Sequence, residues 1–202
     1  DMDATALAEK LRRLEVSSLE AANAYIAHIQ KVNPRVNCMV EDRFEEVCRE
    51  AQRADAKLRE GKAEGRLFGV PVSIKESYDV AGMKTTGGLP YRSKLTAEED
   101  AEVVRRVKAE GAVILGKTNT PVLCFCLETN NKLYGRTNNP WNLSRTAGGS
   151  SGGEAALIAA GGAAVGVGSD IGGSIRMPSH FNGVGGFKCG KKQVPGAGHL
   201  PD

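Results

Sequence analysis

The chain has 202 residues, of which 41% are hydrophobic, 25% charged and 5% aromatic, and its formal net charge is +3. These ordinary globular values exclude a disordered chain, and no run of about 18 apolar residues is present to span a bilayer. The positive charge is scattered rather than arranged in a stripe with aromatic residues, so we expect no nucleic-acid partner. Five cysteines without a metal-type C-x-x-C pair, and no secretory segment at the start, predict a reduced, cytoplasmic protein.

The first 65 residues are predicted to form a helical scaffold, because apolar residues recur there three and four positions apart. Helices are expected over residues 4–14, 17–33 and 44–58. Ser17 and Glu20 form a capping-box pattern, in which each side chain bonds the backbone amide of the other residue. The Asn33-Pro34 pair is expected to end the second helix, because proline has no N–H to continue the helical hydrogen bonds.

Residues 66–202 are predicted to form an α/β core in which helices and strands alternate. Buried strands are expected over residues 69–75, 112–115, 163–168 and 183–188, and helices over residues 100–110 and 154–160. Residues 118–146, rich in Asn, Thr and Pro, are interpreted as a loop. This alternation is typical of a mixed β-sheet covered by helices, and we treat the whole chain, residues 1–202, as a single domain.

Two glycine-flanked serine segments, residues 148–153 and 169–176, indicate a catalytic site. The first segment also matches G-x-S-x-G, the nucleophile elbow of a serine hydrolase. An elbow needs a strand directly before it, whereas residues 139–147 are interpreted as loop. A histidine base would also have to be His180 or His199. This alternative is the less favoured one, and loss of activity on replacing those histidines would support it.

Residues 111–118 match the phosphate-binding pattern G-x-x-x-x-G-K-[ST] letter for letter. A phosphate cradle needs its four middle residues in a flexible loop with inward-facing amides, and here they are four aliphatic residues. A helix stop followed by a buried strand is therefore the favoured interpretation.

Lys75 lies at the end of the predicted strand over residues 69–75 and is a candidate base for a serine nucleophile. Burial disfavours a charged ammonium and lowers the pKa of a lysine, so a buried lysine can accept a proton near neutral pH. An isolated lysine would be interpreted as a solvated surface charge. The neighbouring serine segments favour the catalytic interpretation.

Three motifs in this order resemble the amidase signature family: Gly69-Val-Pro-Val-Ser-Ile-Lys75-Glu, Gly148-Gly-Ser-Ser-Gly-Gly153 and Ser169-Asp-Ile-Gly-Gly-Ser-Ile-Arg176. The separations agree with that family as well, because Lys75 and Ser150 are 75 positions apart and Ser150 and Ser174 are 24 apart. The resemblance covers essentially the whole chain. It implies the amidase signature fold and an amide hydrolase that acts on a small-molecule amide without a metal or an organic cofactor.

By this resemblance Ser174 is the nucleophile, Ser150 is the bridging serine with a cis peptide bond, and Lys75 is the base. The implied relay passes a proton from Ser174 to Ser150 and on to neutral Lys75, and leads to an acyl-enzyme. The oxyanion would be bound by backbone N–H groups of four consecutive residues, Ile171, Gly172, Gly173 and Ser174. Three further residues, Ser151, Asp170 and Arg176, are expected to support this loop by hydrogen bonds.

Within the family, the sequence resembles the fatty acid amide hydrolase branch, its second isoform especially, and bacterial amidases. Ile171 and Met177 stand where the glutamine-hydrolysing component of the glutamyl-tRNA amidotransferase normally carries Thr and Gln, and residues 131–140 also resemble the hydrolase branch. Apolar residues beside the oxyanion loop suit an apolar acyl group, a fatty acyl group included. The glutamine-hydrolysing component of an amidotransferase stays open as an alternative.

Two departures from the family pattern bear on activity. The family usually has Lys-Pro-[ST]-x-Gly where this chain has Lys188-Cys189-Gly190-Lys191-Lys192. Family members also continue far beyond Asp202, so we expect a domain truncated on its C-terminal side. A catalytically inactive fragment with a structural role is therefore a second alternative, and exposed apolar surface would then favour a homo-oligomer or a complex with a partner.

Overall fold

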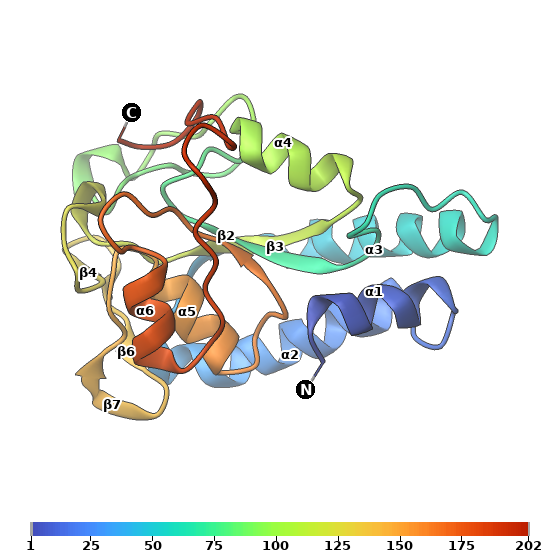
Figure 1. Cartoon of the computed structure of the whole chain (residues 1–202), viewed down its shortest axis with the longest axis horizontal. Coiled ribbons are helices and arrows are strands. Elements are labelled where there is room, and N and C mark those ends of the chain that lie inside the picture. The colour runs from blue at the N-terminus through green and yellow to red at the C-terminus, as the bar shows by residue number, and fades with distance from the viewer. Residues whose placement is uncertain (1, 202) are drawn as a thin grey trace.

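A four-stranded mixed sheet lies at the centre of the protein (Figure 1). The computed structural model describes residues 2–201. The strand order is β1 (Met39–Asp42), β3 (Val113–Thr118), β2 (Pro71–Lys75) and β8 (Gly166–Val167). Strands β3, β2 and β8 run parallel, and β1 runs antiparallel to β3. The parallel strands β2 and β3 were both predicted from their apolar residues. They place Lys75 beside Thr118, where both strands end.

Helices lie on both sides of the sheet in Figure 1. Helix α4 (Glu102–Ala109) lies above β2 and β3 in this view. Helices α2 (Ser18–Val36), α5 (Gly152–Ala159) and α6 (Arg176–Asn182) lie below them. The predicted α/β class, a mixed sheet covered by helices, is therefore confirmed.

Three helices were expected in the first part of the chain, and α1 (Ala4–Arg12), α2 and α3 (Phe44–Arg59) are found there. The capping box at the start of α2 is present, because Ser17 Oγ accepts from the Glu20 amide and Glu20 accepts from the Ser17 amide. The predicted end of α2 is wrong. The helix continues past Pro34 to Val36, because a proline in the last turn removes only one hydrogen bond. The helix ends instead at Asn37, whose left-handed backbone (φ +54°) lets its amide bond the Asn33 carbonyl at 2.7 Å.

Strand β1 lies within residues 1–65, which the sequence predicted to be helical only. Met39 pairs with Thr118 and Asp42 with Gly116, with an irregular register between Met39 and Glu41. An edge strand of four residues carries too few positions to show a period of two. Its existence is decided by the neighbouring strand β3, which supplies the hydrogen-bond partners.

The region after residue 168 differs from its prediction. Residues 183–188 form no strand, and helix α6 lies directly before them and begins shortly after Ser174. Gly183 closes α6 in a left-handed conformation (φ +69°), with its amide bonded to the His180 carbonyl. The glycines of this segment therefore end a helix and continue as irregular chain, where a buried strand was predicted.

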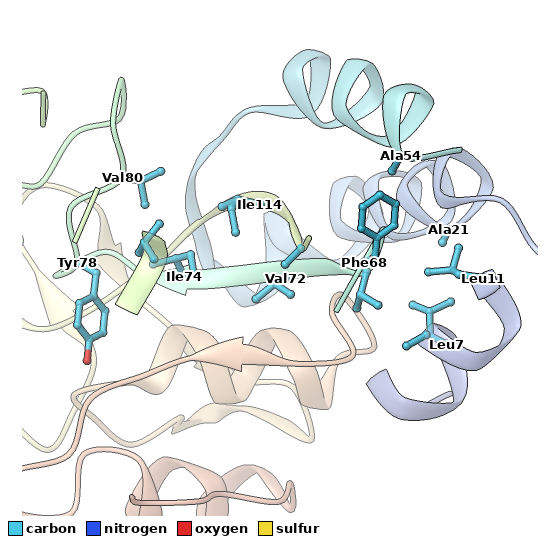
Figure 2. Packing of buried hydrophobic residues seen from close by; sticks show 14 of the residues in the cluster. Leu7, Leu11, Ala21, Ala54, Phe68, Val72, Ile74, Tyr78, Val80 and Ile114 are labelled. Atoms are coloured by element: carbon cyan, nitrogen blue, oxygen red, sulfur yellow. The ribbon is translucent and has the colours of Figure 1, made fainter. Parts of the chain in front are cut away.

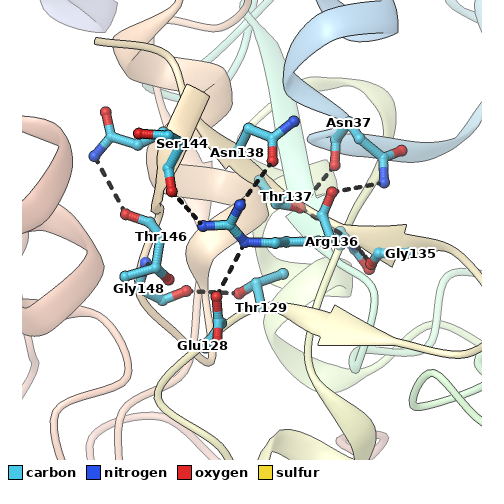
Figure 3. A network of polar contacts seen from close by, with 12 residues as sticks. Asn37, Glu128, Thr129, Gly135, Arg136, Thr137, Asn138, Ser144, Thr146 and Gly148 are labelled. Atoms are coloured by element: carbon cyan, nitrogen blue, oxygen red, sulfur yellow. Dashed lines mark hydrogen bonds and ion pairs between the residues drawn. The ribbon is translucent and has the colours of Figure 1, made fainter. Parts of the chain in front are cut away.

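Two small antiparallel pairs and one short 3-10 helix occupy the region interpreted as loop, and a second 3-10 helix lies in residues for which no element was predicted. The elements are η1 (Pro90–Arg92), η2 (Val122–Cys124), β4 (Asn130–Asn131), β5 (Gly135–Arg136), β6 (Asn138–Asn139) and β7 (Asn142–Thr146). Figure 3 shows the polar network that holds the strand pairs. Arg136 donates to Glu128 at 3.0 Å, and Thr137 Oγ1 donates to the Asn37 carbonyl at 2.6 Å. Thr129 Oγ1 donates to the Gly148 carbonyl at 2.8 Å, so the network reaches the first serine segment.

One of two hydrophobic core clusters runs along β2 and β3 (Figure 2). Val72, Ile74 and Ile114 are at most 1% exposed and line the middle of the cluster. Phe68 and the leucines of α1 close one end, and Tyr78 lies at the other. Burying each large aliphatic side chain contributes about 1.5–3 kcal/mol, so this core fixes the position of β2 and of the lysine that ends it.

Candidate active site

Lys75 is the last residue of β2, a strand in which every side chain is buried. Its side chain is 0% exposed, and its Nζ lies 2.5 Å from Ser150 Oγ and 2.8 Å from Ser169 Oγ. Burial lowers the pKa of Lys75 below the ordinary lysine value, because the charged ammonium loses its hydration. The site therefore favours a neutral amine in hydrogen-bond contact with a serine hydroxyl.

Ser150 lies in the turn that leads into α5 and is 1% exposed. The Gly149–Ser150 peptide bond is cis. Thr120 Oγ1 donates to the Ser150 carbonyl at 3.1 Å, and the Gly152 amide donates to Thr129 Oγ1 at 3.1 Å. Gly153 has to be a glycine, because a Cβ there would lie 2.6 Å from the Asn119 carbonyl oxygen. Close backbone packing and two threonines thus fix the place of the Ser150 hydroxyl.

The second serine segment is organised by Asp170. Its carboxylate accepts from the backbone amides of Gly173 (2.8 Å), Ile175 (3.1 Å) and Arg176 (3.1 Å), and from the Arg176 guanidinium at 2.9 Å. Burial favours the neutral acid, but the hydrogen bonds from Arg176 and the backbone outweigh it and hold the pKa of Asp170 well below its usual range. The carboxylate therefore stays charged and closes the turn that carries Ser174.

Ser151 joins the two serine segments. Its amide donates to the Ser174 carbonyl at 3.0 Å, and its Oγ both donates to the Ser169 carbonyl (3.3 Å) and accepts from the Ser169 amide (3.2 Å). These contacts set the distance between the turn of Ser150 and the turn of Ser174.

Ser150 and Ser174 line one cavity of about 250 Å³. The other lining residues are mainly apolar side chains and loop residues, namely Leu123, Cys124, Phe125, Cys126, Leu127, Ser169, Ile171, Gly172, His199 and Pro201. Ile171 is 90% exposed at its edge. Within residues 2–201 the Ser174 hydroxyl has no hydrogen-bond partner, so it is available to a molecule bound in the cavity.

The four backbone amides expected to form an oxyanion site are not equivalent. The Gly173 amide donates to Asp170, as described above. The amides of Ile171, Gly172 and Ser174 have no acceptor in the part of the chain that the structure describes. The turn therefore leaves three of the four expected N–H groups open.

The nucleophile-elbow interpretation was set aside partly because no strand was expected before Ser150, and that reason is wrong. Strand β7 precedes the segment, although it pairs only with β6 and lies outside the central sheet. The second reason stands, because Ser150 contacts the Lys75 amine rather than an imidazole. His180 is exposed on α6, and His199 bonds Ser169 and Ser77.

The phosphate-binding interpretation of residues 111–118 was rejected correctly. These residues enter strand β3, and the Lys117 side chain is 0% exposed. Its Nζ donates to Thr85 Oγ1 at 2.9 Å and to the Lys84 carbonyl, which leaves no open cradle for a phosphate.

The sequence did not single out several residues of the site. Ser169 stands within the third motif but was given no role, although it bonds Lys75. Cys124 lines the cavity and no local pattern marks it, and His199, which also lines the cavity, was considered only as the base of a nucleophile elbow. Glu154, in the first turn of α5, is 4% exposed and accepts from Ser73 Oγ (2.5 Å) and Thr118 Oγ1 (2.8 Å). Only its place four residues after Ser150 could have drawn attention to it.

Comparison with known proteins identifies the class. The family model described as Amidase matches residues 20–201, so the chain belongs to the amidase family. Fatty-acid amide hydrolase 2-B of Danio rerio is 48% identical over 99% of this chain and 39% of the relative. Indoleacetamide hydrolase of Bradyrhizobium diazoefficiens is 40% identical over 93% of this chain and 36% of the relative. Amidase 1 of Gibberella moniliformis is 43% identical over 92% of this chain and 36% of the relative.

Solved structures similar to this chain are also amidases. The structure of a peptide amidase in complex with the inhibitor chymostatin is 31% identical, covers 100% of this chain and 42% of its own, and has a TM-score of 0.92. A fatty acid amide hydrolase structure is 36% identical, covers 89% of this chain and 32% of its own, and has a TM-score of 0.85. The chain thus spans about two fifths of the length of the curated relatives it matches.

No helix within residues 2–201 is long and apolar enough to cross a membrane. In the same range, no group of three or more His, Cys, Asp and Glu side chains is arranged to hold a metal ion.

Proposed function

We propose that this chain carries the catalytic centre of an amide hydrolase that works through Lys75, Ser150 and Ser174. The observation that carries the proposal is the 2.5 Å contact between the buried Lys75 amine and Ser150, beside a cavity that Ser174 also lines. Membership of the amidase family supports the same reaction class.

In the proposed mechanism Ser174 is the nucleophile and the two other residues move its proton. Neutral Lys75 takes the hydroxyl proton of Ser150, and Ser150 takes that of Ser174. The Ser174 oxygen attacks the amide carbonyl carbon and forms a tetrahedral intermediate. On collapse the C–N bond breaks, the proton returns through Ser150 to the leaving nitrogen, and an ester to Ser174 remains. Water, activated by the same relay, then hydrolyses that acyl-enzyme.

The proposed oxyanion site has fewer available N–H donors than the sequence suggested. The amides of Ile171, Gly172 and Ser174 are free to donate to the developing negative oxygen, whereas the Gly173 amide is held by Asp170. We therefore assign Asp170, Arg176 and Ser151 the role of holding this turn open, through the contacts already described.

The proposal is tested by labelling with a fluorophosphonate, which reacts with an activated serine. Wild-type protein is expected to be labelled on Ser174, as located by peptide mass spectrometry. Lys75→Ala, Ser150→Ala and Ser174→Ala are expected to lower the labelling rate by at least about a hundredfold, which is the usual contribution of a positioned base. His180→Ala, which changes an exposed imidazole, serves as the control and should label normally.

A folded wild-type sample that takes no label would support the inactive-fragment alternative instead. A folded, unlabelled His180 variant would revive the nucleophile elbow, because only a triad depends on an imidazole in that role.

We further propose that the acyl group of the substrate is apolar. Four apolar side chains line the cavity together with Ser174, namely Leu123, Phe125, Leu127 and Ile171, and Phe125 is 79% exposed. The expected result is a kcat/KM that rises with acyl chain length in a series of primary amides, by up to about fourfold per buried methylene. Glutamine belongs in the same series. If it is the best substrate, the glutamine-hydrolysing component of an amidotransferase becomes the better description.

A further inference from the structure

We propose that His199, acting through Ser169, is a positioning residue that turns the lone pair of neutral Lys75 toward Ser150. The inference rests on the proposed function, because it assigns a direction to the base of that mechanism. It is carried by an unbroken set of hydrogen bonds from the Pro201 carbonyl to the Ser150 hydroxyl.

The direction of these bonds follows from which atoms can donate. A carbonyl oxygen only accepts, so His199 Nδ1 must carry the hydrogen of its 3.0 Å contact with the Pro201 carbonyl. A neutral imidazole has one N–H, so His199 Nε2 is an acceptor. Ser169 Oγ lies 2.9 Å from that nitrogen and donates its hydrogen to it.

The direction of this hydrogen bond determines how the Lys75 amine is oriented. Since the one hydrogen of Ser169 Oγ points at His199, its oxygen can only accept in the 2.8 Å contact with Lys75 Nζ. A neutral amine has two hydrogens and one lone pair, and one hydrogen is then committed to Ser169. The lone pair is left for the Ser150 hydroxyl at 2.5 Å, which is the orientation that proton transfer from Ser150 requires.

The backbone holds the imidazole in place. Tyr78 and His199 form an antiparallel bridge, the Leu200 amide donates to the Ser77 carbonyl at 2.7 Å, and the Asp79 amide donates to the Gly198 carbonyl at 2.8 Å. The Tyr78 and His199 rings meet edge to face, with centroids 4.6 Å apart. The segment with His199 is therefore fastened to the residues that directly follow Lys75.

Gly198 allows this close attachment. Its φ is +79°, and a Cβ at this position would lie 2.6 Å from the Cα of Ala101. Ser77 Oγ lies 3.1 Å from His199 Nε2 and competes for the same acceptor, but its contact is longer than that of Ser169. Without the imidazole, the Ser169 hydroxyl is free to rotate and donate to the Lys75 lone pair, where it would displace Ser150.

The test compares variants that break the hydrogen bond between Ser169 and His199 with variants that can still form it. His199→Leu and Ser169→Ala are expected to lower the limiting rate of fluorophosphonate labelling by about tenfold, the effect of one orienting hydrogen bond. The reagent concentration at half-maximal rate should stay unchanged. His199→Gln, whose amide oxygen can accept, and Ser169→Thr, which keeps the hydroxyl, are expected to restore the rate to within about threefold of wild type. His199→Leu combined with Ser169→Ala should be no slower than either single variant, because both changes break the same chain.

His180→Leu is the matched control, because it makes the same chemical change at an exposed site. The inference would be overturned if Lys75→Ala stops labelling but His199→Leu and Ser169→Ala label at the wild-type rate. It would also be overturned if both rescue variants fold but fail to restore the rate. If His199→Leu does not fold, as judged by its thermal unfolding midpoint, the Ser169 pair decides alone. If wild type itself takes no label, or Lys75→Ala labels normally, the proposed function fails and this inference fails with it.

Discussion

At the scale of single residues, two buried lysines on neighbouring strands differ in the groups that they contact. One is the proposed base, and the other only bonds groups inside the protein. Lys75 on β2 and Lys117 on β3 are both 0% exposed. Burial lowers the pKa of Lys117 to about 8, and its amine is bonded to Thr85 and to a backbone carbonyl inside the protein. Lys75 faces two serine hydroxyls beside a cavity. Burial therefore increases the neutral fraction of either amine near pH 7, and of the two only Lys75 contacts hydroxyls that line a cavity.

Cys124 is the residue whose charge most directly affects Lys75. Burial opposes ionisation of this thiol, but its polar contacts, among them the 3.3 Å contact with Thr120 Oγ1, and the positive charge of Lys75 outweigh it and lower the pKa of Cys124 to about 6. In return, burial lowers the pKa of Lys75 and the Cys124 thiolate partly offsets that lowering. The two groups thus compete, because a thiolate at this position stabilises the ammonium form of the proposed base.

We predict that Cys124→Ala shifts the acidic limb of the labelling rate to lower pH. A base works only above its pKa, and removing the thiolate lowers the pKa of Lys75 further, so the neutral amine persists to lower pH. The measurement is the rate of fluorophosphonate labelling of Ser174 across pH. Cys48→Ala, on α3, is the control and should keep the wild-type profile. A shift of the Cys124→Ala limb to higher pH would contradict this account.

At the scale of elements, helix α5 connects the Ser150 turn to the sheet. Its first turn packs so closely that Gly153 meets the backbone of Asn119. The next residue, Glu154, bonds β2 through Ser73 and β3 through Thr118. Burial raises the pKa of Glu154 to about 7, although the two hydroxyl hydrogen bonds act in the opposite direction. One buried carboxyl therefore ties the helix behind Ser150 to the two central strands.

This carboxyl predicts a pH dependence of stability. The pKa of Glu154 is about 7 in the folded protein against a reference value of 4.5, so between these values the folded state holds a proton that the unfolded state releases. Its contribution to the free energy of unfolding is complete below pH 4.5 and is lost as the pH rises through about 7. The loss is at most about 3 kcal/mol, since one pKa unit corresponds to about 1.4 kcal/mol.

Glu154→Gln removes the titration and keeps an amide that can form hydrogen bonds, so its free energy of unfolding should depend less on pH in this window. Denaturant unfolding measured at several pH values between the two limits makes the comparison. Glu45→Gln, with the side chain 88% exposed, should retain the wild-type slope. Equal slopes for the two variants would show that Glu154 does not titrate in this range.

At the scale of the whole molecule, the sheet gathers segments that are far apart in sequence. Strand β2 delivers Lys75, the turn before α5 brings Ser150, and the segment around His199 is bridged to Tyr78 just beyond β2. The four-stranded sheet thus serves as the frame on which the site is assembled (Figure 1).

Much of this frame could be predicted because the determining signals are local. The aliphatic residues of β2 and β3 specify buried strands, Ser17 and Glu20 specify a helix start, and the amphipathic pattern before Gly111 specifies α4. The motifs around Lys75, Ser150 and Ser174 were likewise visible, since glycines next to serines indicate turns that approach a ligand closely. The family could therefore be recognised before any geometry was available.

The remaining features depend on contacts between distant residues. Strand β1 exists because β3 offers it hydrogen bonds, and α2 passes Pro34 because its last turn is capped by Asn37. No sequence pattern reveals that Asp170 occupies the Gly173 amide or that His199 bonds Ser169. Local periodicity determined strands β2 and β3 and helices such as α2 and α4, and the resemblance of three motifs to the amidase signature family indicated the three proposed catalytic residues. The tertiary structure alone decided which donor faces which acceptor, because hydrogen-bond direction is set by groups that the folded chain brings together.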